Sequence, residues 1–99
     1  MQVTVRFLLE AEVELHDAVA FYNAQHAGLG NRLAAEISEG LARIVEYPHA
    51  WPLIGRRVRR YRLLKFPYGL VYVPLPSEIA VVAVMHLHRE PAYWKARLR

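Results

Sequence analysis

Residues 58–94 read VRRYRLLKFPYGLVYVPLPSEIAVVAVMHLHREPAYW, and this stretch predicts three strands followed by the start of a short helix. Residues 58–65 mix basic and apolar side chains, and residues 68–75 are rich in aromatic and β-branched ones. Residues 79–87 are almost wholly apolar, which is typical of a strand in the middle of a sheet. At the end of this strand the polarity changes abruptly to His86, His88, Arg89 and Glu90. A strand that ends in such a cluster beside a basic strand is where we expect recognition or chemistry.

The first half of the chain predicts one strand and two helices. Residues 2–8 alternate polar and apolar side chains, as a strand with one buried face does. Apolar residues then recur at helical spacing from Ala11, and again from about Asn31 to Tyr47, with a glycine turn between the two helices. Prolines at 48 and 52 stop further helix, so we expect an ordered loop there. Pro91 suits the first position of a short final helix that continues to Leu98.

This order, β-α-α-β-β-β-α, predicts a single α+β domain over residues 1–99. Helices that precede a run of short-linked strands favour a helical hairpin packed on one face of an antiparallel four-stranded sheet. The C-terminal helix is too short to cover the opposite face, so we expect an open groove there for a partner or substrate. A lone chain is then expected to form homo-oligomers through this uncovered face.

The composition is that of a folded globular chain. Hydrophobic residues make up 55% of the 99 residues and charged residues 22%, which excludes disorder. The chain has no cysteine, so disulfides and thiolate metal sites are excluded. The longest apolar run, residues 79–85, is too short to span a bilayer, and the N terminus does not read as a signal peptide. We therefore expect a soluble, cytoplasmic protein that does not bind membranes.

The charges are divided unequally along the chain. Residues 1–50 carry three arginines and seven acids (net −4), and residues 51–99 carry ten basic residues and two acids (net +8). Arginine supplies eleven of the thirteen cations, and its forked donors suit phosphate or carboxylate recognition. Four arginines fall within residues 56–60, which favours a polyanion or an acidic protein partner over a merely solvated face.

The basic and aromatic side chains near the last strand are of the types that RNA cleavage without a metal requires. In that reaction a base deprotonates the 2′-hydroxyl, cations stabilise the phosphorane and an acid protonates the leaving oxygen. Spacing alone identifies no nuclease signature, and a structural alternative exists, with His86 at the core edge and Arg89 paired with Glu90. No third ligand completes a zinc site with His86 and His88, so no metal or cofactor is expected. The candidate residues for binding or chemistry are Arg59, Arg60, Tyr61, Arg62, Lys65, His86, His88, Arg89 and Tyr93.

Two motifs in this region make the chain similar to a known family. FPYGLVY (66–72) and HxxREPxYW (86–94), in this order and behind a helical hairpin, resemble the RelE/ParE toxin superfamily of bacterial type II toxin–antitoxin modules. The resemblance covers nearly the whole chain. It implies a small α+β toxin whose groove is covered by a C-terminal segment of a cognate antitoxin. The basic half of the chain suits an acidic segment of that partner.

The superfamily contains two kinds of toxin, which leave two targets open. RelE-like members cleave messenger RNA on the ribosome with a basic cluster and a tyrosine in the last helix. If these roles are carried over to this chain, the resemblance implies that the catalytic residues are Arg62, Lys65, Arg89 and Tyr93, with Arg59 or Arg60 beside them. Arg89 stabilises the phosphorane, and Tyr93 or a nearby histidine acts as the base.

ParE-like members share the fold, lack the nuclease residues and poison DNA gyrase. The loop YPHAWPLIGRR (47–57) contains no lysine, whereas RelE-like enzymes tend to place lysines there. The segments PYGLVY and REPAYW also resemble the ParE branch more closely. We therefore favour a ParE-like gyrase inhibitor over a RelE-like endoribonuclease. A third alternative is a non-toxic module that keeps the fold only to bind an antitoxin.

Overall fold

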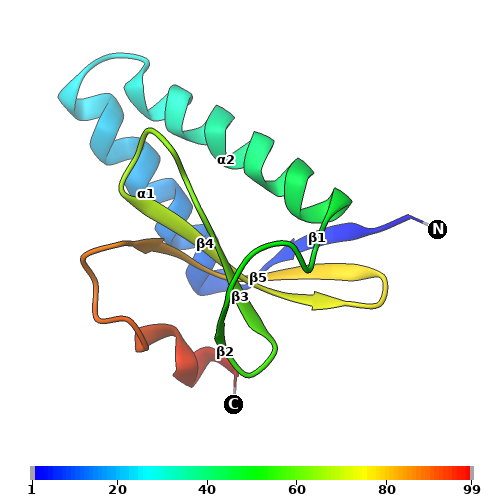
Figure 1. The fold of residues 1–99 in the computed structure, drawn as a ribbon. Coiled ribbons are helices and arrows are strands. Elements are labelled where there is room, and N and C mark those ends of the chain that lie inside the picture. The colour runs from blue at the N-terminus through cyan, green and yellow to red at the C-terminus, as the bar shows by residue number, and fades with distance from the viewer. Residues whose placement is uncertain (1, 99) are drawn as a thin grey trace.

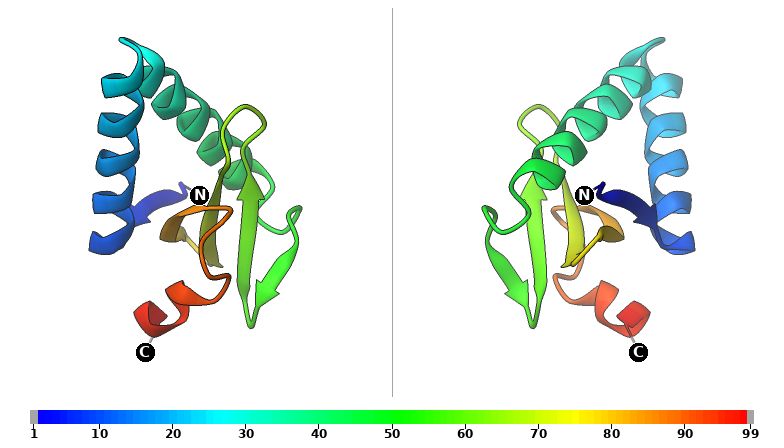
Figure 2. Two further views of the ribbon diagram at one scale, coloured as in Figure 1. Left: turned by 90° about the vertical axis from the view of Figure 1, so that its left-hand side faces the viewer. Right: turned by 90° about the vertical axis from the view of Figure 1, so that its right-hand side faces the viewer.

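The computed structural model describes residues 2–98, which form two helices, a five-stranded sheet and a short 3₁₀ helix (Figure 1). The sheet has the strand order β1-β5-β4-β3-β2. The elements are β1 (Thr4–Phe7), α1 (Leu9–Gln25), α2 (Leu29–Glu46), β2 (Leu53–Gly55), β3 (Val58–Arg62), β4 (Tyr68–Leu75), β5 (Glu78–His86) and η1 (Tyr93–Leu98). The predicted α+β architecture and the helical hairpin on one face of the sheet are confirmed (Figure 2).

The predicted four-stranded antiparallel sheet is wrong in two details. The segment 53–55, predicted as loop, pairs antiparallel with β3 through a turn in which Arg57 has a φ of 65°. The prediction missed this short edge strand because two prolines nearby indicated a loop. In addition, β1 runs parallel to β5, so the sheet is mixed. Both edges of β5 need backbone partners, and β4 occupies one of them, so β1 occupies the other.

The helices cover one face of the sheet and enclose the larger part of the core. Leu33, Ile37 and Ile44 of α2 are almost fully buried and pack against Leu70 and Tyr72 of β4 within the same cluster. Gly40 of α2 allows close approach, because an added Cβ would lie 2.7 Å from Cε1 of Tyr61. The helical spacing of apolar residues in the sequence therefore corresponds to a real buried face.

The opposite face of the sheet is not the open groove that the sequence predicts. Trp94 of η1 is only 2% exposed and packs with Val58, Val71, Val82 and Met85. The prediction treated a short helix as too small to cover this face. One tryptophan buries a large area, so a single anchored turn is enough.

A register shift in β5 decides which residues face which side. The pairs Val71–Ala83 and Tyr72–Val81 follow one another in the ladder, so Val82 is an extra residue on β5. Val81 and Val84 consequently belong to the cluster beneath the helices, and Val82 and Met85 belong to the cluster beneath η1. This shift also places His86 on the helix side, against Tyr68.

We expect Gly40→Ala to lower the free energy of unfolding by about 1–3 kcal/mol, because the added methyl meets the ring of Tyr61. In an open helix the same change would stabilise by up to about 1 kcal/mol. Urea unfolding followed by circular dichroism measures the difference. In a Tyr61→Leu background the loss should shrink, and an equal loss in both backgrounds would contradict the packing explanation.

Candidate functional site

One carboxylate, that of Glu14 on α1, holds the C-terminal segment against the rest of the fold. Its Oε2 accepts a hydrogen bond from the Tyr93 hydroxyl at 2.7 Å, and Arg97 donates to both oxygens at 2.8 and 2.9 Å. Oε1 also accepts the backbone N–H of Val84 at 3.0 Å. This N–H lies on the edge of β5 beyond the last residue that β1 pairs with. Glu14 therefore joins α1, β5 and η1 at one point.

The surroundings of this carboxylate shift the pKa values of two groups. Burial by itself raises the pKa of Glu14, but the hydrogen bonds from Arg97, Tyr93 and Val84 outweigh it and hold the pKa below the ordinary 4.5. Burial and the neighbouring Glu14 carboxylate together raise the pKa of Tyr93. The Tyr93 hydroxyl thus remains a protonated donor to Glu14, which is the opposite of what a general base requires.

Arg89 lies against Tyr93 and His86 lies against His88, but not in the predicted open groove on the far face of the sheet, because His86 is on the helix side. The guanidinium of Arg89 stacks over the Tyr93 ring, with Cζ 4.0 Å from the ring centroid. The rings of His86 and His88 are 5.1 Å apart, and Nδ1 of His86 accepts the backbone N–H of His88 at 3.1 Å. His86 and Arg89 also border a hollow of about 370 Å³ between α1 and β5, which Glu14, Asp17, Ala18, Phe21, Tyr68 and Val84 line as well.

Arg62 and Lys65 line a different hollow. It has a volume of about 510 Å³ and lies between the β3–β4 turn and the end of β5, and His88 is the other basic residue on its wall. Leu63, Leu64, Phe66, Pro67 and Leu87 complete the lining, so no carboxylate borders it among the described residues. The four residues predicted as catalytic therefore divide into two pairs, Arg62 with Lys65 and Arg89 with Tyr93, that line no common cavity.

The remaining predicted binding residues have structural contacts. Arg59 donates to the backbone carbonyls of His49 and Trp51 at 3.2 and 2.7 Å, so it holds the loop after α2. Tyr61 is only 5% exposed, and its hydroxyl accepts a hydrogen bond from Arg43 at 2.7 Å. Its prediction as a surface binding residue is wrong, because it faces the helices and not solvent.

Arg60 lies on the opposite side of β3 from Arg59 and Tyr61. Its methylene stem crosses Gly69 of β4, where an added Cβ would lie 3.0 Å from Cγ and Cδ of the arginine. In the pairing of β3 with β4, Arg60 lies opposite Val71, and the next pair along is Tyr61 with Leu70. Gly69 thus leaves room for the arginine side chain on the η1 side of the sheet.

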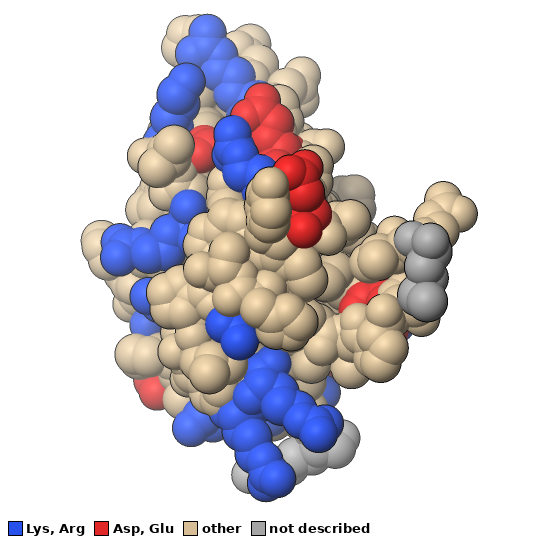
Figure 3. All heavy atoms as spheres, turned by 45° about the vertical axis from the view of Figure 1, so that its right-hand side comes forward, with Lys and Arg blue, Asp and Glu red and all other residues tan. Residues whose placement is uncertain are grey.

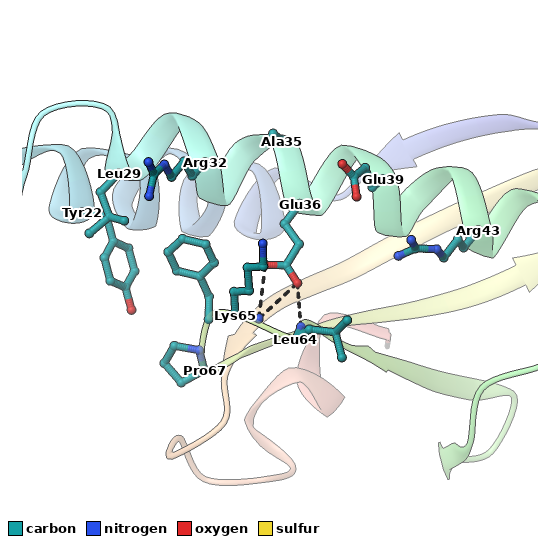
Figure 4. Close-up of a pocket in the computed structure, with 11 residues that line it drawn as sticks. Tyr22, Leu29, Arg32, Ala35, Glu36, Glu39, Arg43, Leu64, Lys65 and Pro67 are labelled. Atoms are coloured by element: carbon teal, nitrogen blue, oxygen red, sulfur yellow. Dashed lines mark hydrogen bonds between the residues drawn. The ribbon is translucent and has the colours of Figure 1, made fainter.

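A hollow of about 970 Å³ lies between α2 and the β3–β4 turn (Figure 4). Glu36 points from α2 to this turn and accepts the backbone N–H groups of Leu64 at 2.6 Å and of Lys65 at 3.3 Å (Figure 4). Leu64 itself is 87% exposed. The sequence marks neither Glu36 nor Glu14 as special, because each stands among other acids on a helix.

On the face drawn in Figure 3, the basic side chains form several separate groups. Uncharged or acidic surface lies between these groups, and the largest group on this face is at the end of the molecule where the β2–β3 turn lies in Figure 1. Two ion pairs are formed among residues 2–98, Arg6 with Glu78 and Arg97 with Glu14. In the same range no three His, Asp or Glu side chains lie close enough to hold a metal ion, and no helix is long and apolar enough to cross a membrane.

Comparison with known proteins identifies the fold. No protein-family model matches the sequence, and no curated protein matches it either. A solved structure described as "Chromosomal ParDE TA system from P. aeruginosa" contains a chain that superposes with a TM-score of 0.76. The match covers 88% of this chain and 98% of that chain. The chain has the RelE/ParE fold. The two sequences are 13% identical, so the likeness extends to the fold alone.

Within the RelE/ParE fold of this chain, the Glu14 cluster generates a prediction about pH and stability. Because the pKa of Glu14 is lowered on folding, its ionised form stabilises the protein above pH 4.5, and this contribution is lost as the pH falls through the lower folded-state pKa. We expect Glu14→Gln to cost about 1–3 kcal/mol near pH 7 and to remove this part of the acid dependence. Denaturant unfolding at several pH values measures both effects.

Two controls separate the roles of the partners of Glu14. Tyr93→Phe removes one hydrogen bond and should cost only about 0.5–1.5 kcal/mol. Glu12→Gln, on the exposed side of the same helix, should leave stability nearly unchanged. If Glu14→Gln and Glu12→Gln have equal effects, Glu14 does not hold the C-terminal segment.

Proposed function

We propose that this chain is the toxin of a type II toxin–antitoxin pair and that it acts as a non-enzymatic inhibitor of DNA gyrase. The observation that carries the toxin proposal is the match to a chain of a ParDE system over nearly the full length of both chains. Sequence and structure support it from different directions, because the resemblance rests on motifs within residues 66–94 and the match rests on the whole fold.

The position of Tyr93 favours the gyrase branch. The RelE-like assignment requires Tyr93 or a nearby group to take a proton, but its hydroxyl donates to Glu14 and its pKa is raised. Arg89 stacks on the same ring and lines a different hollow from Arg62 and Lys65. This arrangement supports a binding protein more than a nuclease.

An antitoxin with an acidic segment is the partner that the charges favour. The second half of the chain carries ten basic residues, and the ion pairs seen among residues 2–98 engage Arg97 alone of these. Arg62 and Lys65 border a hollow without a carboxylate in the described part of the chain. A carboxylate-rich segment would supply the missing acceptors.

Messenger RNA cleavage on the ribosome is the second candidate, and one observation favours it. Arg62, Lys65 and His88 line one hollow, so two cations and a group able to carry a proton lie together without Tyr93. In this version His88 would exchange the proton and the cations would hold the phosphate. A non-toxic module that binds an antitoxin is the third candidate function.

Expression in a bacterial host distinguishes the three candidate functions. We expect induction of the chain to stop growth, the purified chain to block DNA supercoiling by gyrase, and primer extension on cellular messages to show no new cuts. The double variant Arg62→Ala/Lys65→Ala should still arrest growth. RNA cleavage that falls by about 100-fold or more in this variant would instead identify the nuclease.

Arg56→Ala/Arg57→Ala is the matched control, because it removes the same charge at the β2–β3 turn, away from the hollow. Tyr93→Phe should leave the activity intact, since the hydroxyl has no chemical role in the proposal. If the unaltered chain is well expressed and growth continues, the toxin proposal fails and the non-toxic module remains.

A further inference from the structure

The turn between β3 and β4, residues 63–67, stands between two hollows. The hollow of about 970 Å³ lies on the α2 side of this turn, and the hollow of about 510 Å³ lies on the side of the end of β5. Leu64, Lys65, Phe66 and Pro67 line both of them. A ligand that crosses this turn can therefore contact both hollows at once.

The most exposed large apolar side chain of residues 2–98 is at this turn. Leu64 is 87% exposed, against 74% for Leu9 and 57% for Leu53. Leu64 borders two hollows, whereas Leu9 and Leu53 border none of the three hollows described above. The partly buried rings of Tyr22 and Phe66 continue the apolar surface into the larger hollow. An apolar side chain of a partner would remove Leu64 from water here.

The turn is held in place by contacts with both helices. Glu36 of α2 accepts the backbone N–H groups of Leu64 and Lys65, as Figure 4 shows. The ring of Phe66 packs at a steep angle on Tyr22 of α1, with 5.2 Å between the ring centroids. The turn is therefore a preformed surface, and a preformed surface loses less conformational entropy when a ligand binds.

The charges around the turn select an acidic ligand. Arg32 and Lys65 border the larger hollow, and Arg62 and Lys65 border the smaller one. The two ion pairs formed among residues 2–98 involve none of these three cations. Two acids border the larger hollow, Glu36 and Glu39, and Glu36 already accepts two backbone N–H groups. Cations therefore outnumber the carboxylates that could pair with them, and an acidic ligand would supply the acceptors.

The aliphatic residue between the cations favours a peptide over a polynucleotide. A peptide can carry an aliphatic side chain between two carboxylates, whereas a polynucleotide carries a phosphate at every step and offers flat bases. Leu64 has no ring on which a base could stack, and Phe66 beside it already packs on Tyr22. The occupant that these observations favour is an acidic peptide segment with an apolar residue at its centre.

We propose that such a segment crosses the β3–β4 turn, with its apolar side chain on Leu64 and a carboxylate on each side of it. One carboxylate binds Arg32 in the larger hollow, and the other binds Arg62 and Lys65 in the smaller one. The assignment of this segment to the antitoxin rests on the proposed function, whereas the binding surface rests on the contacts and charges of the turn.

An NMR titration of the isotope-labelled chain with the peptide acetyl-Glu-Glu-Leu-Glu-Glu-amide tests the proposal. We expect the largest amide shifts within residues 62–68 and at His88, and weaker binding at high salt because ions screen the charges. The peptide with serine in place of leucine should bind about 5-fold or more weakly, since it cannot bury Leu64. Equal binding of the two peptides, shifts concentrated at the β2–β3 turn, or no shift at millimolar peptide overturns the proposal.

Variants of the chain test the apolar and the charged contacts separately. Leu64→Ser should weaken binding of the leucine peptide by about 5-fold or more, because the apolar contact is lost. Arg62→Ala/Lys65→Ala should weaken it by a similar factor of about 5 or more, because one carboxylate loses its donors.

Matched controls stand on the neighbouring hairpin. Leu53→Ser removes another exposed leucine, and Arg56→Ala/Arg57→Ala removes the same charge at the β2–β3 turn. Both should bind the peptide as the unaltered chain does, and a loss equal to that of the turn variants overturns the proposal. Because all the altered residues are exposed, circular dichroism should show the same fold in every variant.

A different occupant and a failure of the toxin proposal give distinct results. If the RNA oligonucleotide tetrauridylate shifts these amides and the peptide does not, the surface binds nucleic acid and the proposal is overturned. Peptide binding by a chain that does not arrest growth supports this surface while the proposed function fails. Growth arrest by a chain that does not bind the peptide overturns this surface and leaves the toxin proposal standing.

Discussion

The carboxylate of Glu14 is the point on which the arrangement of the chain depends. It lies on the first helix, yet it accepts hydrogen bonds from the central strand and from two residues of the C-terminal segment, Tyr93 and Arg97. Besides these contacts, η1, which is six residues long, is held by the packing of Trp94 and by a hydrogen bond from Arg97 to the backbone carbonyl of Val82 at 3.1 Å. A carboxylate that is only 17% exposed is stable there because each oxygen has charged or polar donors. This single side chain joins segments that are 70 to 83 residues apart in the chain.

The extra residue in β5 has an equally wide effect. It reverses the side on which the later residues of the strand emerge, so Val84 joins Val81 beneath the helices and Met85 joins Val82 beneath η1. One set packs beneath the helices and the other beneath Trp94. The same reversal directs His86 toward α1 and Tyr68, and the chain then turns so that Arg89 reaches Tyr93. The polar cluster at the end of β5 is thus a consequence of the bulge and of the Glu14 contacts together.

The basic residues fall into groups with different surroundings. Arg97 and Arg59 are used within the fold, one on a carboxylate and the other on backbone carbonyls. Arg62 and Lys65 border a hollow that contains no carboxylate in the described chain. A strongly basic half of a sequence therefore does not amount to one basic site. Binding of an acidic partner would engage the second group, because the arginines of the first are already occupied.

The sequence by itself determined most of the local elements and the buried faces of the two helices. The apolar spacing of α2, the unbroken apolar run of β5 and the glycine turn between the helices each predict a structure that nearby residues suffice to specify. The resemblance at residues 66–94 also predicted the fold. Only the tertiary structure decided the features that depend on contacts between residues far apart in the sequence. These are the parallel pairing of β1, the closure of the second face by Trp94, the burial of Tyr61 and the hydrogen bonds of Glu14. Glu14 reads as one acid among several on a helix, and only the three-dimensional arrangement brings Val84, Tyr93 and Arg97 to it.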